Sequence, residues 1–268
     1  MFENAAVGQP VPVDELVVPS ELCRNVVSDP AAVVDAAVEL IAHMCGHIGV
    51  TDLGGLEVLD FGCGVRFTQA FLNRGVPIKH YVGVDVSPAV IDFLRSNVSD
   101  PRFEFFHLDA HNELYNPTGQ PLSELTVPEI EGRRFDLICL FSVFTHLAPP
   151  DYAAMLELLR RFVKPDGRLF YTLFINERTA GGLGYVDRLS AAIASSQDRR
   201  VKEGIAAALE SGEAIPDFRD ADRSQPLLVA LYSRRHAMEL IDGTGWKVLE
   251  VSPPDAHIQH HIVCSPIE

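Results

Sequence analysis

The feature that most constrains the fold is an alternation of short apolar runs with longer segments of helical periodicity. The runs are rich in β-branched and aromatic residues, as strands are, and we expect strands at residues 56–61, 81–85, 103–108, 135–141, 169–174, 246–251 and 258–264. Apolar residues recur at helical spacing at residues 66–74, 88–97, 151–163 and 233–242. Apolar strands that are each followed by a helix predict an α/β fold, in which helices cover both faces of a parallel sheet.

The last two apolar runs depart from this alternation. Only residues 252–257 connect them, whereas a parallel crossover needs about a dozen residues or more. The final strand should therefore be antiparallel to its neighbour. The sequence predicts a Rossmann-like sheet of seven strands, mostly parallel, with the last strand antiparallel.

A proline-rich arm and one helix precede the first strand. Residues 9–13 contain two prolines and should be extended. Asp29 and Pro30 then provide an N-cap and an N1 proline for a helix over residues 31–47. Residues 1–55 are therefore expected to form an N-terminal arm and helix outside the repeating unit.

A long segment, residues 176–231, interrupts the alternation after the fifth strand. Connections in α/β units usually have about 2–6 residues. Its alanine-rich part, residues 185–209, has helical spacing, so we expect an inserted helical lid; an oligomer interface, for example in a homodimer, is the alternative. The inserted lid at 176–231 divides the predicted main domain into residues 56–175 and 232–268.

The charge of the chain argues against several classes of partner. There are 22 Lys and Arg residues against 37 Asp and Glu residues, a formal net charge of −15. Proteins that bind nucleic acids or anionic membranes need basic surfaces, and no basic run occurs here, so neither partner is expected. The five cysteines are scattered without a Cys-x-x-Cys pair, which fits neither a disulfide framework nor a zinc site. With no leader and no apolar run near about 20 residues, we expect a cytoplasmic protein.

The strongest local motif follows the first predicted strand, where Asp60, Gly62 and Gly64 form an Asp-x-Gly-x-Gly turn. Glycines at such a turn let a ligand approach the backbone at the carboxyl ends of the strands. A nicotinamide or flavin fingerprint needs a third glycine three residues later, but Phe67 occupies that position. Asp60 would also repel a pyrophosphate, so the turn favours a cationic ligand.

Two further strands end in acidic residues. Asp85 ends the second strand and is followed by Val86; a carboxylate at this place can accept hydrogen bonds from both hydroxyls of a ribose. Asp109 and Ala110 follow the third strand, where Asp109 could accept a hydrogen bond from an adenine amino group or simply cap a loop.

With these motifs, the chain resembles the class I S-adenosylmethionine-dependent methyltransferases over residues 56–174 and, in architecture, 232–264. The resemblance implies S-adenosyl-L-methionine as cofactor and a small-molecule or glycan acceptor. It also implies that the cofactor is bound by Asp60, Gly62, Gly64, Asp85, Val86, Asp109 and Ala110, with Phe141 next to the reacting centre. Many members have a third glycine where this chain has Arg66, which loosens the prediction for the start of the helix.

The loop after the fourth strand supplies a candidate catalytic residue, His146. A hydroxyl acceptor must lose its proton, and imidazole titrates near neutral pH, so His146 is the candidate general base. The alternative is a structural histidine that is hydrogen-bonded to the following helix. A second histidine cluster spans residues 255–261; we expect these histidines to be solvated or packed, and no metal site.

The identity of the acceptor is constrained only loosely. Base methyltransferases of this fold have a polar-Pro-Pro-aromatic motif, and residues 148–151 lack its first and last members. Residues 115–119 and 142–147 are similar to segments of bacterial methyltransferases for glycans and secondary metabolites. We therefore expect O-methylation of a sugar or secondary-metabolite hydroxyl. The alternatives are a small-molecule N-methyltransferase, a nicotinamide-dependent oxidoreductase, which Phe67 and Asp60 disfavour, and a non-catalytic cofactor-binding or assembly protein.

Overall fold

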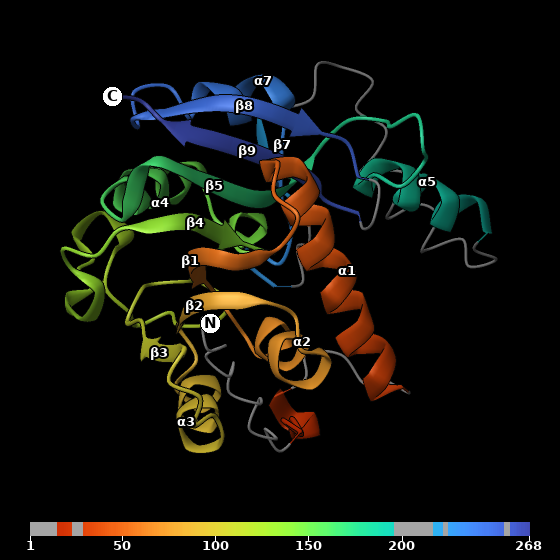
Figure 1. Cartoon of the computed structure of the whole chain (residues 1–268). Coiled ribbons are helices and arrows are strands. Elements are labelled where there is room, and N and C mark those ends of the chain that lie inside the picture. Colours follow the sequence, from red (N-terminus) through yellow and green to blue (C-terminus); the bar gives the residue numbers. More distant parts are fainter. Residues whose placement is uncertain (1–14, 23–28, 196–216, 222–224, 255–257) are drawn as a thin grey trace, which may run out of the picture.

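A computed structural model of the chain describes residues 15–22, 29–195, 217–221, 225–254 and 258–268, and these contain one nine-stranded sheet (Figure 1). The strands are β1 Leu53–Phe61, β2 Ile78–Asp85, β3 Phe103–His107, β4 Phe135–Leu140, β5 Val163–Ile175, β6 Phe218–Asp220, β7 Ala230–Tyr232, β8 Trp246–Ser252 and β9 His260–Pro266. Their order is β3-β2-β1-β4-β5-β7-β6, and β9 lies between β5 and β8. The predicted α/β class is confirmed.

The predicted antiparallel strand is β9, which pairs antiparallel with both β5 and β8. The parallel pairs are β1 with β2 and β4, β2 with β3, β4 with β5, and β5 with β7. Two strands more than expected are present because the inserted segment contributes β6 and β7. Residues 174 and 175, at the end of the long strand β5, pair with β7, whereas residues 169–173 pair with β9.

Helices cover both faces of the sheet, as the apolar strands predict. The helices are α1 Pro30–Ile48, α2 Arg66–Arg74, α3 Pro88–Asn97, α4 Pro149–Arg160, α5 Tyr185–Ser195 and α7 Arg234–Glu239, and 3₁₀ turns lie at Ser20–Leu22, Leu122–Glu124, Pro128–Ile130 and Phe144–His146. Helices α1, α2 and α3 pack against one face around Met44, Phe71 and Leu94. Helices α4 and α7 pack against the other face, where Leu156 and Ala237 are buried. Helices α1 and α2 lie toward the viewer in Figure 1.

The start of α1 follows from its capping residues. The Asp29 carboxylate accepts hydrogen bonds from the backbone N–H groups of Ala31 and Ala32 at 3.0 and 3.3 Å, and Pro30 is the first helical residue, as predicted. By length and composition α1 could also cross a membrane, although the sequence reasoning expected no such run. Five of its apolar residues, Val34, Ala37, Ile41, Met44 and Cys45, are buried in the protein.

The inserted segment is only partly helical. Helix α5 begins at Tyr185, where a helix was expected, but its described part ends at Ser195, and the remainder of the predicted helix lies outside the described residues. Strands β6 and β7 then pair antiparallel and extend the sheet beside the end of β5. The helix of the predicted lid is thus present in its described part, and the lid role stays a prediction; β6 and β7 were not expected, because three-residue strands show too little periodicity to be recognised.

A candidate cofactor and active site at the carboxyl ends of the strands

The turn after β1 requires glycine at both predicted positions. Gly62 and Gly64 have φ angles of +84° and +49°, in the left-handed region that other residues rarely adopt. A Cβ atom on Gly62 would lie 2.5 Å from Cγ2 of Val143. The N–H groups of Gly62 and Cys63 donate to the carbonyl of Val84 at 2.7 and 3.0 Å, so the turn is fixed to the end of β2.

Asp85 joins this turn to the start of α3. Its Oδ2 atom accepts a hydrogen bond from the Gly64 N–H and its Oδ1 atom from the Ser87 N–H, both at 2.9 Å. The residue is only 4% exposed. A carboxylate has about four acceptor positions, so two remain for the hydroxyl groups of a ribose. The geometry thus fits the role that the sequence predicts for Asp85.

Asp60 lies beneath the turn, on the side of the sheet that α2 covers. It is 2% exposed, and the Tyr81 hydroxyl donates to its Oδ2 atom at 2.6 Å. Burial raises the pKa of Asp60 to about 7; hydrogen bonds from Tyr81 and Cys139 oppose this shift, and the charge of Asp85 adds to it. Asp60 therefore titrates near neutral pH, and its ionised form gains from a nearby cation.

Neither of these two carboxylates has a cationic partner among the residues that the structure describes. Tyr81 and Cys139 bond to Asp60, and backbone N–H groups bond to Asp85. The charge of Asp85 raises the pKa of Asp60, and a positive ligand nearby would favour the ionised form of Asp60. The site is therefore suited electrostatically to a cation such as a sulfonium.

Asp109 and Ala110 begin a loop that folds back on itself. Asp109 is exposed, and its carboxylate accepts hydrogen bonds from the side-chain amides of Asn116 at 3.1 Å and Gln120 at 3.4 Å. Ala110 is 2% exposed and its carbonyl accepts from Asn116 Nδ2 at 3.0 Å. Asp109 thus stabilises its own loop, and its contact with adenine stays a prediction.

Val86 and Phe141, the two other predicted contacts, lie on either side of the turn. Val86 is partly buried and packs against the hydrophobic core on the face of the sheet that α4 and α7 cover. Strand β4 ends at Leu140, so Phe141 is the first residue beyond it. The Phe141 ring lies 4.9 Å from that of Phe67 and 5.3 Å from that of Phe170, which places it beside the start of α2.

His146 ends the 3₁₀ turn that follows β4, and its ring contacts the inserted segment. Its Nδ1 atom lies 3.1 Å from the carbonyl oxygen of Leu227. A carbonyl oxygen can only accept, so Nδ1 carries the proton and Nε2 is the basic nitrogen of the neutral ring. The ring of Tyr115, which is 37% exposed, packs edge-on against His146 at 5.4 Å. The described ring contact with Leu227 comes from the inserted segment, and the choice between a general base and a structural histidine stays open.

Sequence reasoning missed a polar group that joins β4, β5 and β9. Ser142 has a φ angle of +57°, which is rare for a residue with a side chain and concentrates at functional sites. Its N–H donates to the Thr172 hydroxyl at 2.8 Å, and its own hydroxyl lies 2.8 Å from Nε2 of Gln259. No sequence motif links these residues, because Ser142 and Gln259 are 117 positions apart.

The two described histidines at the start of β9 face opposite sides of the sheet, as strand alternation predicts. His260 bonds through Nε2 to Glu177 at 2.9 Å, whereas His261 contacts His43 of α1. Both residues are fully buried, so they are packed rather than solvated. His257 lies outside the described residues.

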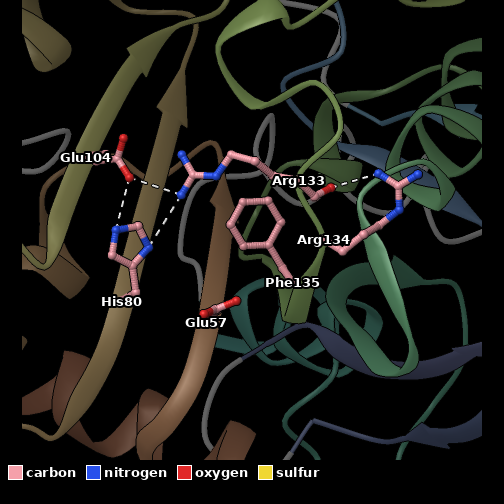
Figure 2. Close-up of a pocket in the computed structure, with 6 residues that line it drawn as sticks. All are labelled: Glu57, His80, Glu104, Arg133, Arg134 and Phe135. Carbon is pink, nitrogen blue, oxygen red and sulfur yellow. Dashed lines mark hydrogen bonds and ion pairs between the residues drawn. The ribbon is translucent and has the colours of Figure 1, made fainter.

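A pocket lies at the other end of the sheet, toward the amino ends of β2, β3 and β4. Its lining includes His80, Glu104 and Arg133. Figure 2 shows the Arg133 and His80 side chains turned toward the Glu104 carboxylate, with distances of 3.0 Å from each. Because these charged groups already pair with one another, the pocket is a poor candidate for the ligand site.

Comparisons with known proteins show the family to which the chain is similar. A family model described as a methyltransferase domain matches residues 32–251. A malonyl-[acyl-carrier protein] O-methyltransferase of Acetivibrio thermocellus is 28% identical over 123 residues, covering 41% of this chain and 44% of the relative. A ubiquinone biosynthesis O-methyltransferase of Neisseria meningitidis serogroup A is 26% identical over 130 residues, covering 46% of each. The chain therefore matches about half the length of these curated relatives.

A solved structure shares the fold over most of both chains. The magnesium protoporphyrin IX methyltransferase of Synechocystis PCC 6803, solved with bound S-adenosylhomocysteine, has a TM-score of 0.51 and 13% sequence identity, with 92% of each chain covered. At this identity the likeness concerns the fold alone.

Proposed function

The chain belongs to the class I S-adenosylmethionine-dependent methyltransferases, and we propose that the whole protein methylates a hydroxyl group of a sugar or secondary-metabolite-like small molecule. The two curated relatives described above are both named O-methyltransferases, which supports oxygen as the acceptor atom. The net charge of −15 supports a small-molecule acceptor over nucleic acid.

The residues at the carboxyl ends of β1, β2 and β3 fit the cofactor. Gly62 and Gly64 expose backbone for close approach, Asp85 has acceptor positions for the ribose hydroxyls, and Asp60 adds negative charge nearby. Val86 and Ala110 are proposed to flank the adenine, with Asp109 near its amino group. When bound, S-adenosylmethionine supplies an electrophilic methyl group.

The remaining requirement is a base that removes the proton of the acceptor hydroxyl. The observation that supports His146 in this role is its contact with the carbonyl of Leu227 at 3.1 Å. This contact holds the Nδ1 proton, so that Nε2 can take a proton from a hydroxyl. Leu227 belongs to the inserted segment, and we propose that this segment closes over the acceptor.

The direct test is incubation of the full chain with methyl-labelled S-adenosylmethionine and a panel of sugars, phenols, other hydroxyl compounds and amines. We expect at least one hydroxyl compound to gain one methyl group, detected by mass spectrometry. Methylation of amines alone would identify an N-methyltransferase, and cofactor binding without any methylated product would favour a non-catalytic protein.

The role of His146 is tested with the His146→Ala and His146→Gln variants once an acceptor is known. General-base catalysis contributes about 10²–10⁴-fold, so both variants should lose that factor in kcat while the affinity for S-adenosylhomocysteine is retained. Unchanged kcat in both variants would exclude His146 as the base.

A homodimer and a cytoplasmic location remain predictions.

A further inference from the structure

Three histidines meet where α1 crosses the end of the sheet. His43 and His47 come from α1, and His261 comes from β9. Residues four positions apart lie on the same face of a helix, so both histidines of α1 are presented to β9. Their ring centroids lie 4.3 Å apart, and the His43 ring lies 4.3 Å from that of His261.

The ring nitrogens of this cluster lie close enough together to bind one metal ion. Each histidine offers one ring nitrogen, and the three nitrogens lie within 4.8 Å of one another. A tetrahedral zinc ion with Zn–N bonds of about 2.0–2.1 Å separates its ligand nitrogens by about 3.3 Å. The Nε2 atom of His43 is 2.7 Å from Nδ1 of His261, a hydrogen-bond distance. An ion that replaces the proton between them would require these two nitrogens to separate to about 3.3 Å.

A carboxylate supports one of the three rings. Oε1 of Glu250 lies 3.0 Å from Nδ1 of His47, and the Ser252 hydroxyl donates to the same oxygen. Carboxylates commonly accept the second ring N–H of a metal-binding histidine, which fixes its tautomer and increases its basicity. With its Nδ1 proton held by Glu250, His47 has Nε2 as its metal-binding nitrogen.

The surroundings separate the cluster from bulk water on one side. His261 is fully buried, and the exposed fraction of the His47 side chain is 17%. The Phe170 ring stacks on His261 at 5.5 Å and lies 5.3 Å from that of Phe141. The cluster itself contains none of the residues proposed to bind the cofactor.

We propose that His43, His47 and His261 bind a divalent transition-metal ion of the zinc type, with a fourth coordination position for water. Imidazole nitrogens are favoured ligands for such ions. The ion would join α1 to β9 and so fix the helix against the carboxyl end of the sheet. The site does not depend on the proposed methyl transfer. This proposal differs from the prediction that the chain has no metal site. That prediction rested on residues 255–261 alone, whereas His43 lies 218 positions before His261.

The test uses the full chain without a histidine tag, freed of metal with a chelator. Titration with Co²⁺ should give the visible absorption of a tetrahedral ion and saturate at one equivalent, and Zn²⁺ should displace it. X-ray absorption of the zinc-loaded protein should show about three nitrogen ligands at about 2.0–2.1 Å. This measurement needs no variant, so it stands even if a substitution prevents folding. Absence of stoichiometric binding by the wild-type chain would overturn the proposal.

Substitutions then locate the ion. His43→Ala, His47→Ala and His261→Ala should each abolish binding of one equivalent, and Glu250→Gln should weaken the affinity about 10–100-fold. His80→Asn is the matched control, because His80 is also partly buried and bonded to a glutamate, Glu104 at 3.0 Å; it should bind metal like the wild type. Full binding by folded His43→Ala and His47→Ala variants would also overturn the proposal.

Discussion

Two carboxylates on β1, only three positions apart, have opposite environments at the two ends of the sheet. Glu57, toward the amino end, pairs with Lys79 at 3.0 Å and Lys164 at 2.9 Å, and hydrogen bonds from Lys164 and Lys79 lower its pKa to about 2. Asp60, at the carboxyl end, is bonded to a hydroxyl, and burial raises its pKa to about 7. The Glu57 charge is thus neutralised within the protein, whereas we propose that a cationic ligand neutralises the Asp60 charge.

The largest effect is expected from Gly62→Ala, which adds a Cβ atom to the turn after β1. A left-handed φ costs about 1–2 kcal/mol for alanine, and overpacking against Val143 costs about 1–3 kcal/mol more. We expect the free energy of unfolding to fall by about 2–5 kcal/mol in denaturant titrations, with loss of S-adenosylhomocysteine binding in the folded fraction.

Gly75 provides the control for that substitution. Its φ angle is +63°, but a Cβ atom there would meet nothing within 4 Å. Gly75→Ala should therefore lower the free energy of unfolding only by the cost of the left-handed φ angle, about 1–2 kcal/mol. This variant should bind the cofactor normally. Equal effects of the two substitutions on cofactor affinity would contradict the role of the turn.

Asp85→Asn tests whether the carboxylate at the end of β2 binds the ribose. Hydrogen bonds to charged groups contribute about 1.5–3 kcal/mol, so we expect a 10–100-fold weaker affinity for S-adenosylhomocysteine by calorimetry. Asp100→Asn, at an exposed turn where Asp100 pairs with Arg102 at 2.6 Å, is the control and should leave the affinity unchanged. An Asp85→Asn variant with wild-type affinity would remove Asp85 from the site.

The pH dependence of cofactor binding tests Asp60. With a pKa of about 7, its ionised fraction rises from about one tenth at pH 6 to about nine tenths at pH 8. The affinity for the sulfonium of S-adenosylmethionine should therefore increase up to about tenfold relative to that for the uncharged thioether of S-adenosylhomocysteine. The ratio of the two affinities should not change with pH in Asp60→Asn, and a constant ratio in the wild type would show that Asp60 does not act on the ligand.

Asp60 and Glu57, the two carboxylates of β1, should affect the pH dependence of folding stability in opposite directions. Asp60 binds a proton more tightly when folded, so its contribution to stability is present below about pH 4 and is lost as the pH rises toward 7. Glu57 has a lowered pKa, so its contribution is present above about pH 4.5 and is lost as the pH falls toward 2. Comparison of the pH–stability profiles of Asp60→Asn and Glu57→Gln with that of the wild type checks both directions.

The smallest effect is expected at the amino end. Glu57→Gln removes a partly exposed pair of interactions, and such pairs contribute about 0–1 kcal/mol. Urea titrations at pH 7 should show a loss of that size, and cofactor affinity should be unchanged. A large loss of cofactor affinity in Glu57→Gln would contradict the proposal that the cofactor binds at the carboxyl end of the sheet and not at the amino end.

Local features of the fold and site could be predicted from the sequence. The bounds of α2 and α3 match the periodicity, because helix periodicity and capping act over a few residues. The glycine turn follows β1 and Asp85 ends β2, as predicted. The hydrogen bond from the Gly64 N–H to Asp85 brings them together because strand ends in a parallel sheet meet at one edge; their binding of the cofactor stays a prediction.

Contacts between distant residues could not be predicted. Tyr81 bonds to Asp60 because β1 and β2 pair in a register that brings these residues together. Leu227 contacts His146 from a position 81 residues away. The meeting of His43 with His261 depends on how α1 crosses the sheet, which no local pattern encodes.

The most direct measurement is isothermal titration calorimetry of the full chain at pH 8 with S-adenosylmethionine and, separately, with S-adenosylhomocysteine. We expect one equivalent of each compound to bind. The ratio of the affinity for S-adenosylmethionine to that for S-adenosylhomocysteine should be larger at pH 8 than at pH 6. Absence of heat for both compounds, together with no rise in Tm, would contradict the claim that the acidic carboxyl end of the sheet binds this cation.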